Sequence, residues 1–353
     1  MIVEVAGCGV CHTDVGFAFD GVPTRAPLPL TLGHEISGRI VAAGESATEW
    51  EGRNVIVPAV IPCGDCSPCR AGQQTICRQQ FMPGNDGDGG FATHVRVPAR
   101  ELCPVPEELP TGITLDLLSV VADAVTTPFE AIRRSGLGAD DVAAFVGVGG
   151  VGGFGVQIAA ALGASVIAID VDPARLELAA QHGASLTLDA SSANEKELKS
   201  AVRSFVKQSG RRRIGLKIFE TSGTPAGQTI AFGLLDYGGY LAVVGLTSKK
   251  VESSSEVLTR PRSAISLSSL VFGTSVVSLS NTMNCLVKPP MKPYAEHTRQ
   301  LEHPHPFVKV RDRLIANGLL MRPRLRLKQL PEAFHASDCL ASKVVKEQAY
   351  TKL

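Results

Sequence analysis

The sequence has 353 residues, more than one hydrophobic core usually supports, and this length predicts two domains. Its 35 Lys and Arg residues balance its 34 Asp and Glu residues, so the charge favours neither nucleic acid nor an anionic membrane as a partner. With 44% hydrophobic residues and 35 glycines the composition is typical of an α/β protein, and no apolar run reaches the roughly 20 residues that cross a bilayer.

Residues 1–125 contain short strand-like segments interrupted by Gly and Pro, such as 35–44 and 54–61. Apolar residues rarely recur there with a helical period. The pattern predicts an irregular, mainly antiparallel β domain.

From residue 126 the pattern changes to strands that alternate with helices, which predicts crossover units and a parallel sheet over residues 126–265. The expected helices are 129–137, 152–164, 173–184, 195–210 and 226–239, and the expected strands are 142–146, 166–170, 186–190, 215–223 and 240–246.

Beyond residue 246 the signal is weaker, with a Ser-rich stretch at 253–270 and a Pro-rich stretch at 288–306. A helix is expected at 308–318, and a strand followed by a helix at 324–343. We expect residues 266–353 to return to the first domain.

Four cysteines follow one another as C-x2-C-x2-C-x7-C, at Cys63, Cys66, Cys69 and Cys77. Four thiolates in one short loop satisfy the closed tetrahedral shell of a structural zinc ion. An iron–sulfur cluster is the main alternative, although ferredoxin-type runs differ in the last interval. In a cytosolic chain, reduced thiols favour metal binding over disulfides.

A glycine-rich turn lies between the strand expected at 142–146 and the next helix, with Gly147, Gly149 and Gly152 as G-x-G-x-x-G. The first glycine permits a tight turn, the second lets a pyrophosphate approach and the third allows close helix-to-strand contact. Asp170 ends the following strand, where a carboxylate binds ribose hydroxyls and would repel a 2′-phosphate. The segment predicts a site for NAD.

Cys11 and the pair His34 and Glu35 lie outside these motifs. Cys and His are typical ligands of a zinc ion that keeps an open position for substrate. By spacing alone, each residue is more often a buried structural residue than a ligand.

The motifs GVCHTD, GHE, C-x2-C-x2-C-x7-C and GVGGVG occur here in the order found in zinc-containing medium-chain alcohol dehydrogenases, which residues 3–246 resemble. The resemblance implies a GroES-like catalytic domain and a Rossmann coenzyme domain. It implies Cys11, His34 and Asp123 as catalytic-zinc ligands, with Glu35 close to the metal and Asp14 orienting His34. The family usually has Cys where this chain has Asp123.

The same resemblance assigns further roles. Thr13 would carry the hydroxyl that passes on the substrate proton, His12 would contact the coenzyme pyrophosphate, and Thr127 would lie against nicotinamide. Many relatives extend the proton relay through a His where this chain has Gly16. Met1 falls inside what the family has as an early strand.

Longer segments, among them 17–24, 119–131 and 217–235, resemble the branch that oxidises 6-hydroxycyclohex-1-ene-1-carbonyl-CoA. The resemblance therefore implies NAD-linked oxidation of a ring secondary alcohol carried as a CoA thioester. Another alcohol or polyol as substrate, and a zinc-stabilised NAD-binding protein without turnover, are the alternatives.

Together these expectations describe a cytoplasmic enzyme with two Zn2+ per chain and NAD. Its partner would be a small-molecule alcohol or hydroxyacyl-CoA substrate, with no nucleic acid and no membrane. The family implies a homodimer or homotetramer.

Overall fold

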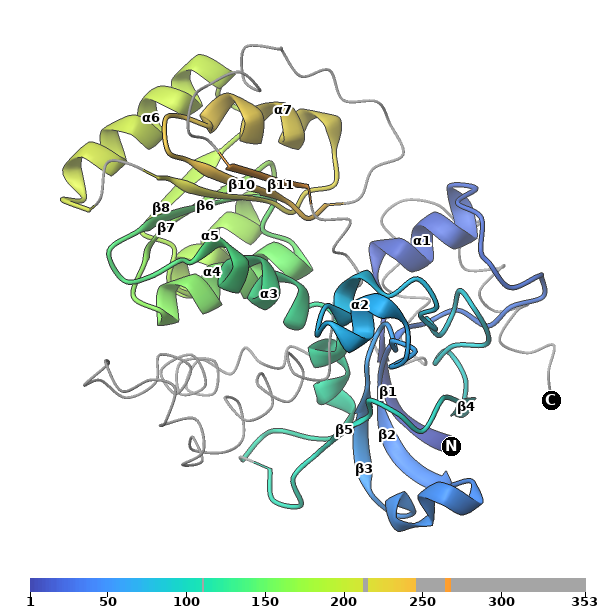
Figure 1. Cartoon of the computed structure of the whole chain (residues 1–353). Helices are drawn as coiled ribbons and strands as arrows, with labels where there is room; N and C mark the ends of the chain where they lie inside the picture. The colour runs from blue at the N-terminus through green and yellow to red at the C-terminus, as the bar shows by residue number, and fades with distance from the viewer. Residues whose placement is uncertain (110, 212–214, 246–263, 268–353) are drawn as a thin grey trace. The chain divides into compact units, whose positions relative to one another are not determined.

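The computed structural model describes residues 1–109, 111–211, 215–245 and 264–267, and it divides into two compact units (Figure 1). One unit holds Met1–Thr126 and the other begins at Thr127. The helix expected at 308–318 and the strand and helix expected at 324–343 lie outside the described residues. So does nearly all of the segment expected to return to the first domain.

The first unit is built on a five-stranded sheet in the order β4-β1-β2-β3-β5, in which all neighbours are antiparallel. Its strands are β1 (Ile2–Gly9), β2 (Glu35–Ala42), β3 (Asn54–Val57), β4 (His94–Arg96) and β5 (Cys103–Pro104). Val3, Ile36 and Val55 are fully buried and belong to one apolar cluster. The antiparallel β domain expected from the sequence is confirmed.

Short helices lie between the strands of this unit, and the first of them, α1, follows β1. They are α1 (His12–Phe19), α2 (Ser67–Arg70) and the 3-10 turns η1 (Glu45–Trp50), η2 (Gln74–Ile76) and η3 (Asp116–Ala122). The helix α1 was not expected from the sequence, because its eight residues show little amphipathic periodicity. Its first turn is instead held by Asp14, whose Oδ2 accepts a hydrogen bond from the Cys11 N–H at 2.9 Å.

The second unit contains a parallel six-stranded sheet in the order β11-β10-β9-β6-β7-β8. Its strands are β6 (Val142–Val146), β7 (Ser165–Asp170), β8 (Leu186–Asp189), β9 (Lys217–Glu220), β10 (Tyr240–Val243) and β11 (Ala264–Leu267). The strand order reverses at β6 and β9, so their carboxyl ends mark the place where ligands bind in such sheets.

Helices cover both faces of this sheet (Figure 1). They are α3 (Thr126–Ser135), α4 (Gly150–Ala161), α5 (Pro173–Gln181), α6 (Glu195–Gln208) and α7 (Pro225–Leu234). All five residues of β6 are buried, as a parallel strand covered on both sides requires. The Phe145 and Phe219 rings stack beneath α4 with centroids 4.7 Å apart, and Gly155 leaves room for Phe145. The alternating elements expected from residue 126 to residue 246 are confirmed.

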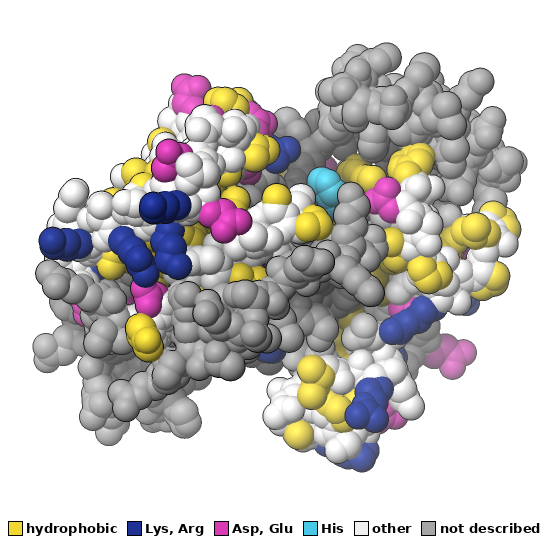
Figure 2. All heavy atoms as spheres, turned by 90° about the horizontal axis from the view of Figure 1, so that it is seen from above, with side chains coloured by type: hydrophobic (Ala, Val, Ile, Leu, Met, Phe, Trp, Pro, Cys, Tyr) yellow, Lys and Arg dark blue, Asp and Glu magenta, His cyan; other side chains and the backbone are white. Residues whose placement is uncertain are grey.

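No helix among the described residues has the length and apolar character needed to cross a bilayer. On the face shown in Figure 2, basic and acidic side chains of the described residues lie among uncharged ones. This mixture agrees with the balanced charge of the sequence.

Candidate metal and coenzyme sites

The four clustered cysteines come together in the loop after β3, around α2 and η2. The four Sγ atoms lie within 4.8 Å of one another, with Cys66 to Cys69 at 3.4 Å, Cys66 to Cys77 at 3.8 Å and Cys63 to Cys69 at 3.9 Å. A tetrahedral zinc ion with Zn–S bonds of about 2.3 Å requires S–S separations of about 3.8 Å. A disulfide would require about 2.05 Å. The cluster therefore fits a closed zinc site.

Backbone N–H groups donate hydrogen bonds to sulfur atoms of this cluster. The pKa of Cys66 is lowered, whereas a hydrogen bond with the Asp65 side chain raises the pKa of Cys63 to about 12 and burial raises that of Cys69. The Cys66 N–H donates to Cys63 Sγ at 3.3 Å, and the Cys63 N–H donates to Cys77 Sγ at 3.3 Å. The backbone N–H of Cys69 is the largest cause that lowers the pKa of Cys66, to about 6. Hydrogen bonds to sulfur stabilise the thiolate, which is the metal-binding form.

A second cluster joins Cys11, His34 and Asp123, residues far apart in the sequence. Asp123 Oδ2 lies 3.5 Å from His34 Nε2 and 3.9 Å from Cys11 Sγ. A tetrahedral zinc ion would place these pairs about 3.4 Å and about 3.6 Å apart. His34 is fully buried, and within the part of the chain that the structure describes its Nε2 has no hydrogen-bond partner. Since a buried nitrogen is costly to leave unpaired, the three ligand atoms fit a metal ion.

Asp14 holds two of these ligands in place. Its Oδ2 accepts the Cys11 N–H at 2.9 Å, and its Oδ1 accepts the Gly33 N–H at 3.1 Å. The same Oδ1 lies 3.2 Å from His34 Nδ1, so it fixes the ring orientation that directs Nε2 toward Asp123. The structure thus places Asp14 where the resemblance implied a carboxylate that orients His34.

The electrostatic field at this cluster favours a positive charge. Burial lowers the pKa of His34, but Asp14 and Asp123 outweigh burial and the pKa is raised well above its ordinary value. A field that stabilises a proton on imidazole also stabilises a metal cation. The charge distribution and the geometry therefore agree.

Four further residues expected near the metal or the coenzyme lie outside the group of three ligand atoms. Thr13 is buried, and its Oγ1 lies 3.7 Å from Cys11 Sγ. His12 is exposed at the start of α1, and Thr127 is buried in the first turn of α3. Glu35 is buried but does not belong to the group of three ligand atoms, since its carboxylate lies against Gly9.

The glycine-rich turn joins β6 to α4. Gly147 has φ of +88°, and a Cβ there would lie 2.6 Å from Ser222 Cα. A Cβ at Gly152 would overlap the Gly147 carbonyl, whereas at Gly149 the nearest atom is 3.8 Å away. Gly149 is also the N-cap residue of α4 and provides no side-chain cap, so the first N–H groups of the helix are left for a ligand. The sterics at Gly147 and Gly152 agree with the roles expected of them, and the open space beside Gly149 leaves room for a pyrophosphate.

Asp170 ends β7 and stabilises this turn. Its Oδ2 accepts the Val148 N–H at 2.7 Å, and its Oδ1 accepts the N–H groups of Val171 and Asp172 at 2.8 Å and 3.0 Å. Each carboxylate oxygen has two lone pairs, so Oδ2 retains capacity to accept a ribose hydroxyl.

Arg175, which the sequence motifs did not indicate, lies on α5 close to both parts of this site. Its Nη1 lies 3.9 Å from Asp170 Oδ1 and would lie 3.8 Å from a Cβ on Gly149. A basic residue five positions after the strand-ending Asp was the available signal. Its guanidinium adds positive charge beside the turn that fits phosphate.

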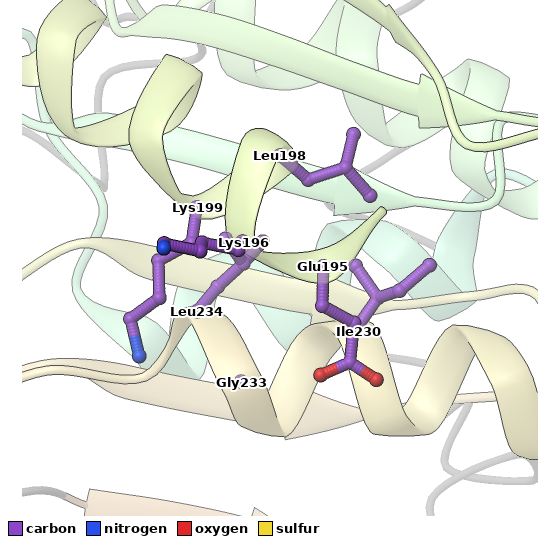
Figure 3. Close-up of a pocket in the computed structure, with 7 residues that line it drawn as sticks. All are labelled: Glu195, Lys196, Leu198, Lys199, Ile230, Gly233 and Leu234. Carbon is purple, nitrogen blue, oxygen red and sulfur yellow. The ribbon is translucent and has the colours of Figure 1, made fainter. Parts of the chain in front are cut away.

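A cavity of about 280 Å³ lies between α6 and α7, away from these motifs (Figure 3). Its lining residues are Glu195, Lys196, Leu198, Lys199, Ile230, Gly233 and Leu234. None of them belongs to the metal clusters or the glycine-rich turn, so this cavity does not explain the chemistry of the motifs.

Comparison with known proteins matches residues 1–107 to the alcohol dehydrogenase GroES-like domain and residues 150–288 to the zinc-binding dehydrogenase family. An alcohol dehydrogenase of Rhizobium meliloti is 31% identical over 249 residues, covering 70% of this chain and 69% of its own. One from Geobacillus stearothermophilus is 35% identical over 191 residues, covering 54% and 56%. This chain therefore spans little more than half the length of the Geobacillus stearothermophilus protein.

Among solved structures, galactitol-1-phosphate dehydrogenase from Escherichia coli matches with a TM-score of 0.68 and 25% identity. The match covers 83% of each chain. The fold is therefore α/β, with a GroES-like domain and a Rossmann domain. The sequence matches, the glycine-rich turn and the two ligand clusters lead to one conclusion: the chain belongs to the zinc-containing medium-chain alcohol dehydrogenase family.

Proposed function

We propose that this protein is a zinc-dependent, NAD-linked dehydrogenase that oxidises a secondary alcohol to a ketone. The observation that carries the proposal is the buried group of Cys11, His34 and Asp123, which offers three ligand atoms and is oriented by Asp14. A purely structural zinc site would have four protein ligands. Three are typical of a site that also admits a substrate.

A zinc ion held by these residues would supply a Lewis acid that polarises the substrate oxygen and lowers its pKa. The thiolate of Cys11 and the carboxylate of Asp123 would balance the charge of the ion. The Thr13 hydroxyl, 3.7 Å from Cys11 Sγ, is placed to accept the substrate proton and donate its own toward solvent. A bound NAD would supply the hydride acceptor, so that oxidation of the alcohol to the ketone would yield NADH and one proton.

The coenzyme proposed is NAD, held by Gly147, Gly149, Gly152 and Asp170. Asp170 favours NAD over NADP because its carboxylate would repel the 2′-phosphate on the ribose of NADP. Arg175 moderates this preference, since its guanidinium lies 3.9 Å from that carboxylate. His12 and Thr127 are proposed coenzyme contacts on the strength of the family resemblance.

The proposed substrate class is a ring secondary alcohol, with 6-hydroxycyclohex-1-ene-1-carbonyl-CoA as the specific candidate. Its support is the sequence resemblance together with Asp123, which fits that branch. The relatives described above, an alcohol dehydrogenase and a polyol phosphate dehydrogenase, support an unactivated alcohol or polyol as the second candidate. We propose a reducing compartment such as the cytoplasm, because the four clustered cysteines can bind zinc only as reduced thiolates.

The test measures zinc content and NADH formation for the zinc-replete protein and for Cys11→Ser. Substrates are the CoA thioester, the corresponding free cyclohexenol, a simple secondary alcohol and sorbitol. Cys8→Ser is the matched control, since Cys8 lies on the same segment and outside the ligand group. We expect Cys11→Ser to lose turnover by at least about 100-fold and to keep NADH binding, while Cys8→Ser stays active.

The substrate panel separates the candidates. Turnover of the thioester alone supports the CoA-linked substrate, whereas turnover of simple alcohols or sorbitol supports the broader assignment. A protein that binds zinc and NADH but oxidises none of them would refute the dehydrogenase proposal and favour a binding protein. Unchanged turnover in Cys11→Ser would refute the role of Cys11 as a ligand.

A further inference from the structure

Glu220 is a buried carboxylate that the proposed chemistry does not use. It ends β9 at the edge of the sheet where the glycine-rich turn lies, and it is 0% exposed. Its Oε1 accepts three hydrogen bonds, from the Ser222 N–H at 2.8 Å, the Ser222 hydroxyl at 2.5 Å and the Gly223 N–H at 3.1 Å. One oxygen therefore fixes the turn formed by residues 221–223.

The second oxygen of Glu220 is in a different situation. Oε2 is buried and has no hydrogen-bond partner among the residues that the structure describes. The unpaired oxygen has lost its hydration without gaining a hydrogen bond, which costs folding free energy. A carboxylate is therefore an unfavourable group to use only for holding a turn. A buried group of this kind in a native structure calls for an explanation, such as a functional role, stored strain or a bound water.

The described elements packed most closely on β9 offer Glu220 no charged partner. Among the described elements, those with the most extensive contacts to β9 are β6, β10 and α7, and none of these three contains Asp, Glu, Lys or Arg. Their one titratable residue is Tyr240, which pairs with Lys217 at the far end of β9. Burial therefore raises the pKa of Glu220, although Ser222, Gly223 and Gln228 of α7 partly offset this.

The turn that Glu220 holds packs directly on the coenzyme turn. A Cβ on Gly147 would lie 2.6 Å from the Ser222 Cα, so the two backbones are in contact. The Thr221 hydroxyl donates to the Gly147 carbonyl at 2.6 Å, and the Thr221 N–H donates to Val146 O at 2.9 Å. A shift of residues 221–223 must therefore displace Gly147 and, with it, the N-terminus of α4.

We propose that Glu220 is a positioning residue of the coenzyme site, which in its ionised form holds the 221–223 turn against Gly147 in the shape that binds the dinucleotide. This inference rests on the proposed binding of NAD. Charged acceptors form stronger hydrogen bonds than neutral ones. Protonation of Glu220 at low pH therefore loosens the turn and weakens coenzyme binding.

The experiment measures NADH affinity by fluorescence titration from about pH 5 to about pH 8, for the full chain and for Glu220→Gln. The amide oxygen of Gln can still accept from the turn but carries no charge. We expect Glu220→Gln to bind NADH about fivefold more weakly at neutral pH. The reason is that hydrogen bonds to the neutral amide oxygen are weaker than those to the charged carboxylate. We expect the NADH affinity of wild type to fall toward acid pH and that of Glu220→Gln to stay constant.

Asp189→Asn is the matched control. Asp189 ends β8, and its Oδ1 accepts from the Ser191 N–H at 2.7 Å and the Ser191 hydroxyl at 2.6 Å, the same contacts that Glu220 makes with Ser222. Its turn lies three strands away from Glu220. We expect this variant to keep wild-type affinity and pH dependence.

A Glu220→Gln protein with the affinity and pH profile of wild type would overturn the inference while leaving the proposed coenzyme intact. A wild-type chain that binds no NADH at any pH would instead overturn the proposed function and the inference with it. Thermal unfolding of each variant distinguishes a local change from general unfolding. Ser222→Ala, which removes one of the three donors, should weaken binding in the same direction if Glu220→Gln is too unstable to measure.

Discussion

Replacing Asp14 with Asn tests the proposed catalytic-metal site without removing a ligand. The Asp14 carboxylate accepts from Cys11 N–H on one side, and on the other accepts from Gly33 N–H and faces His34. Asn has one acceptor oxygen, so its NH2 group must meet a donor on one of these sides. The loss of one charge-assisted hydrogen bond costs about 1.5–3 kcal/mol. Since about 1.4 kcal/mol is a factor of ten, we expect zinc affinity to fall about 10- to 100-fold.

The assay follows zinc release to a chromogenic chelator of graded concentration. Wild type should release its two zinc ions in two steps, and Asp14→Asn should shift one step to about 10- to 100-fold lower chelator while the other stays in place. Asp88→Asn is the control, because Asp88 accepts from the Thr31 N–H at 3.0 Å and is not part of either cluster. Two unshifted steps in Asp14→Asn would refute the reasoning.

Two further outcomes are expected. Cys69→Ser should remove the other zinc ion and lower the stability of the loop between β3 and β4, which limited proteolysis would detect; an equally resistant loop would contradict a structural role. Burial raises the pKa of Glu130, but Arg133 and Arg134, at 2.7 Å and 2.8 Å, outweigh it and hold the pKa below its ordinary value. The ionised Glu130 carboxylate therefore stabilises the folded protein at pH values above the ordinary pKa of Glu. This stabilisation is lost as the pH falls through the lowered pKa of the folded state. Glu130→Gln should therefore unfold about 1 kcal/mol more easily near pH 7, with a difference that vanishes in acid; a constant difference from pH 7 to acid would contradict the prediction.

Strand and helix positions in the coenzyme domain could be predicted because each element carries its own local signal. Buried parallel strands such as β6 are continuous apolar runs, and the glycines of the turn after it have distinct steric requirements. The same local character explains the cysteine cluster, whose four ligands lie within one loop. In both cases the information lies within about twenty residues.

The helix α1 and the residues Arg175 and Glu220 were not found in this way. Asp14 stabilises the start of α1 by a side-chain bond that periodicity does not reveal. Glu220 gains its position from the contact between two turns that are separated by more than seventy residues. Such contacts depend on how the strands are ordered in the sheet.

The sequence by itself determined the family, the glycine-rich turn and the four-cysteine loop, because those features depend on neighbouring residues and their spacing. Tertiary structure decided that Cys11, His34 and Asp123 meet at one point, since three pieces of chain must fold together before their ligand atoms come within 4.8 Å. It also decided that Asp14 links two of those ligands and that Glu220 lies against the coenzyme turn. Hydrogen bonds and buried charges act over a few ångströms in space, whatever the distance along the chain.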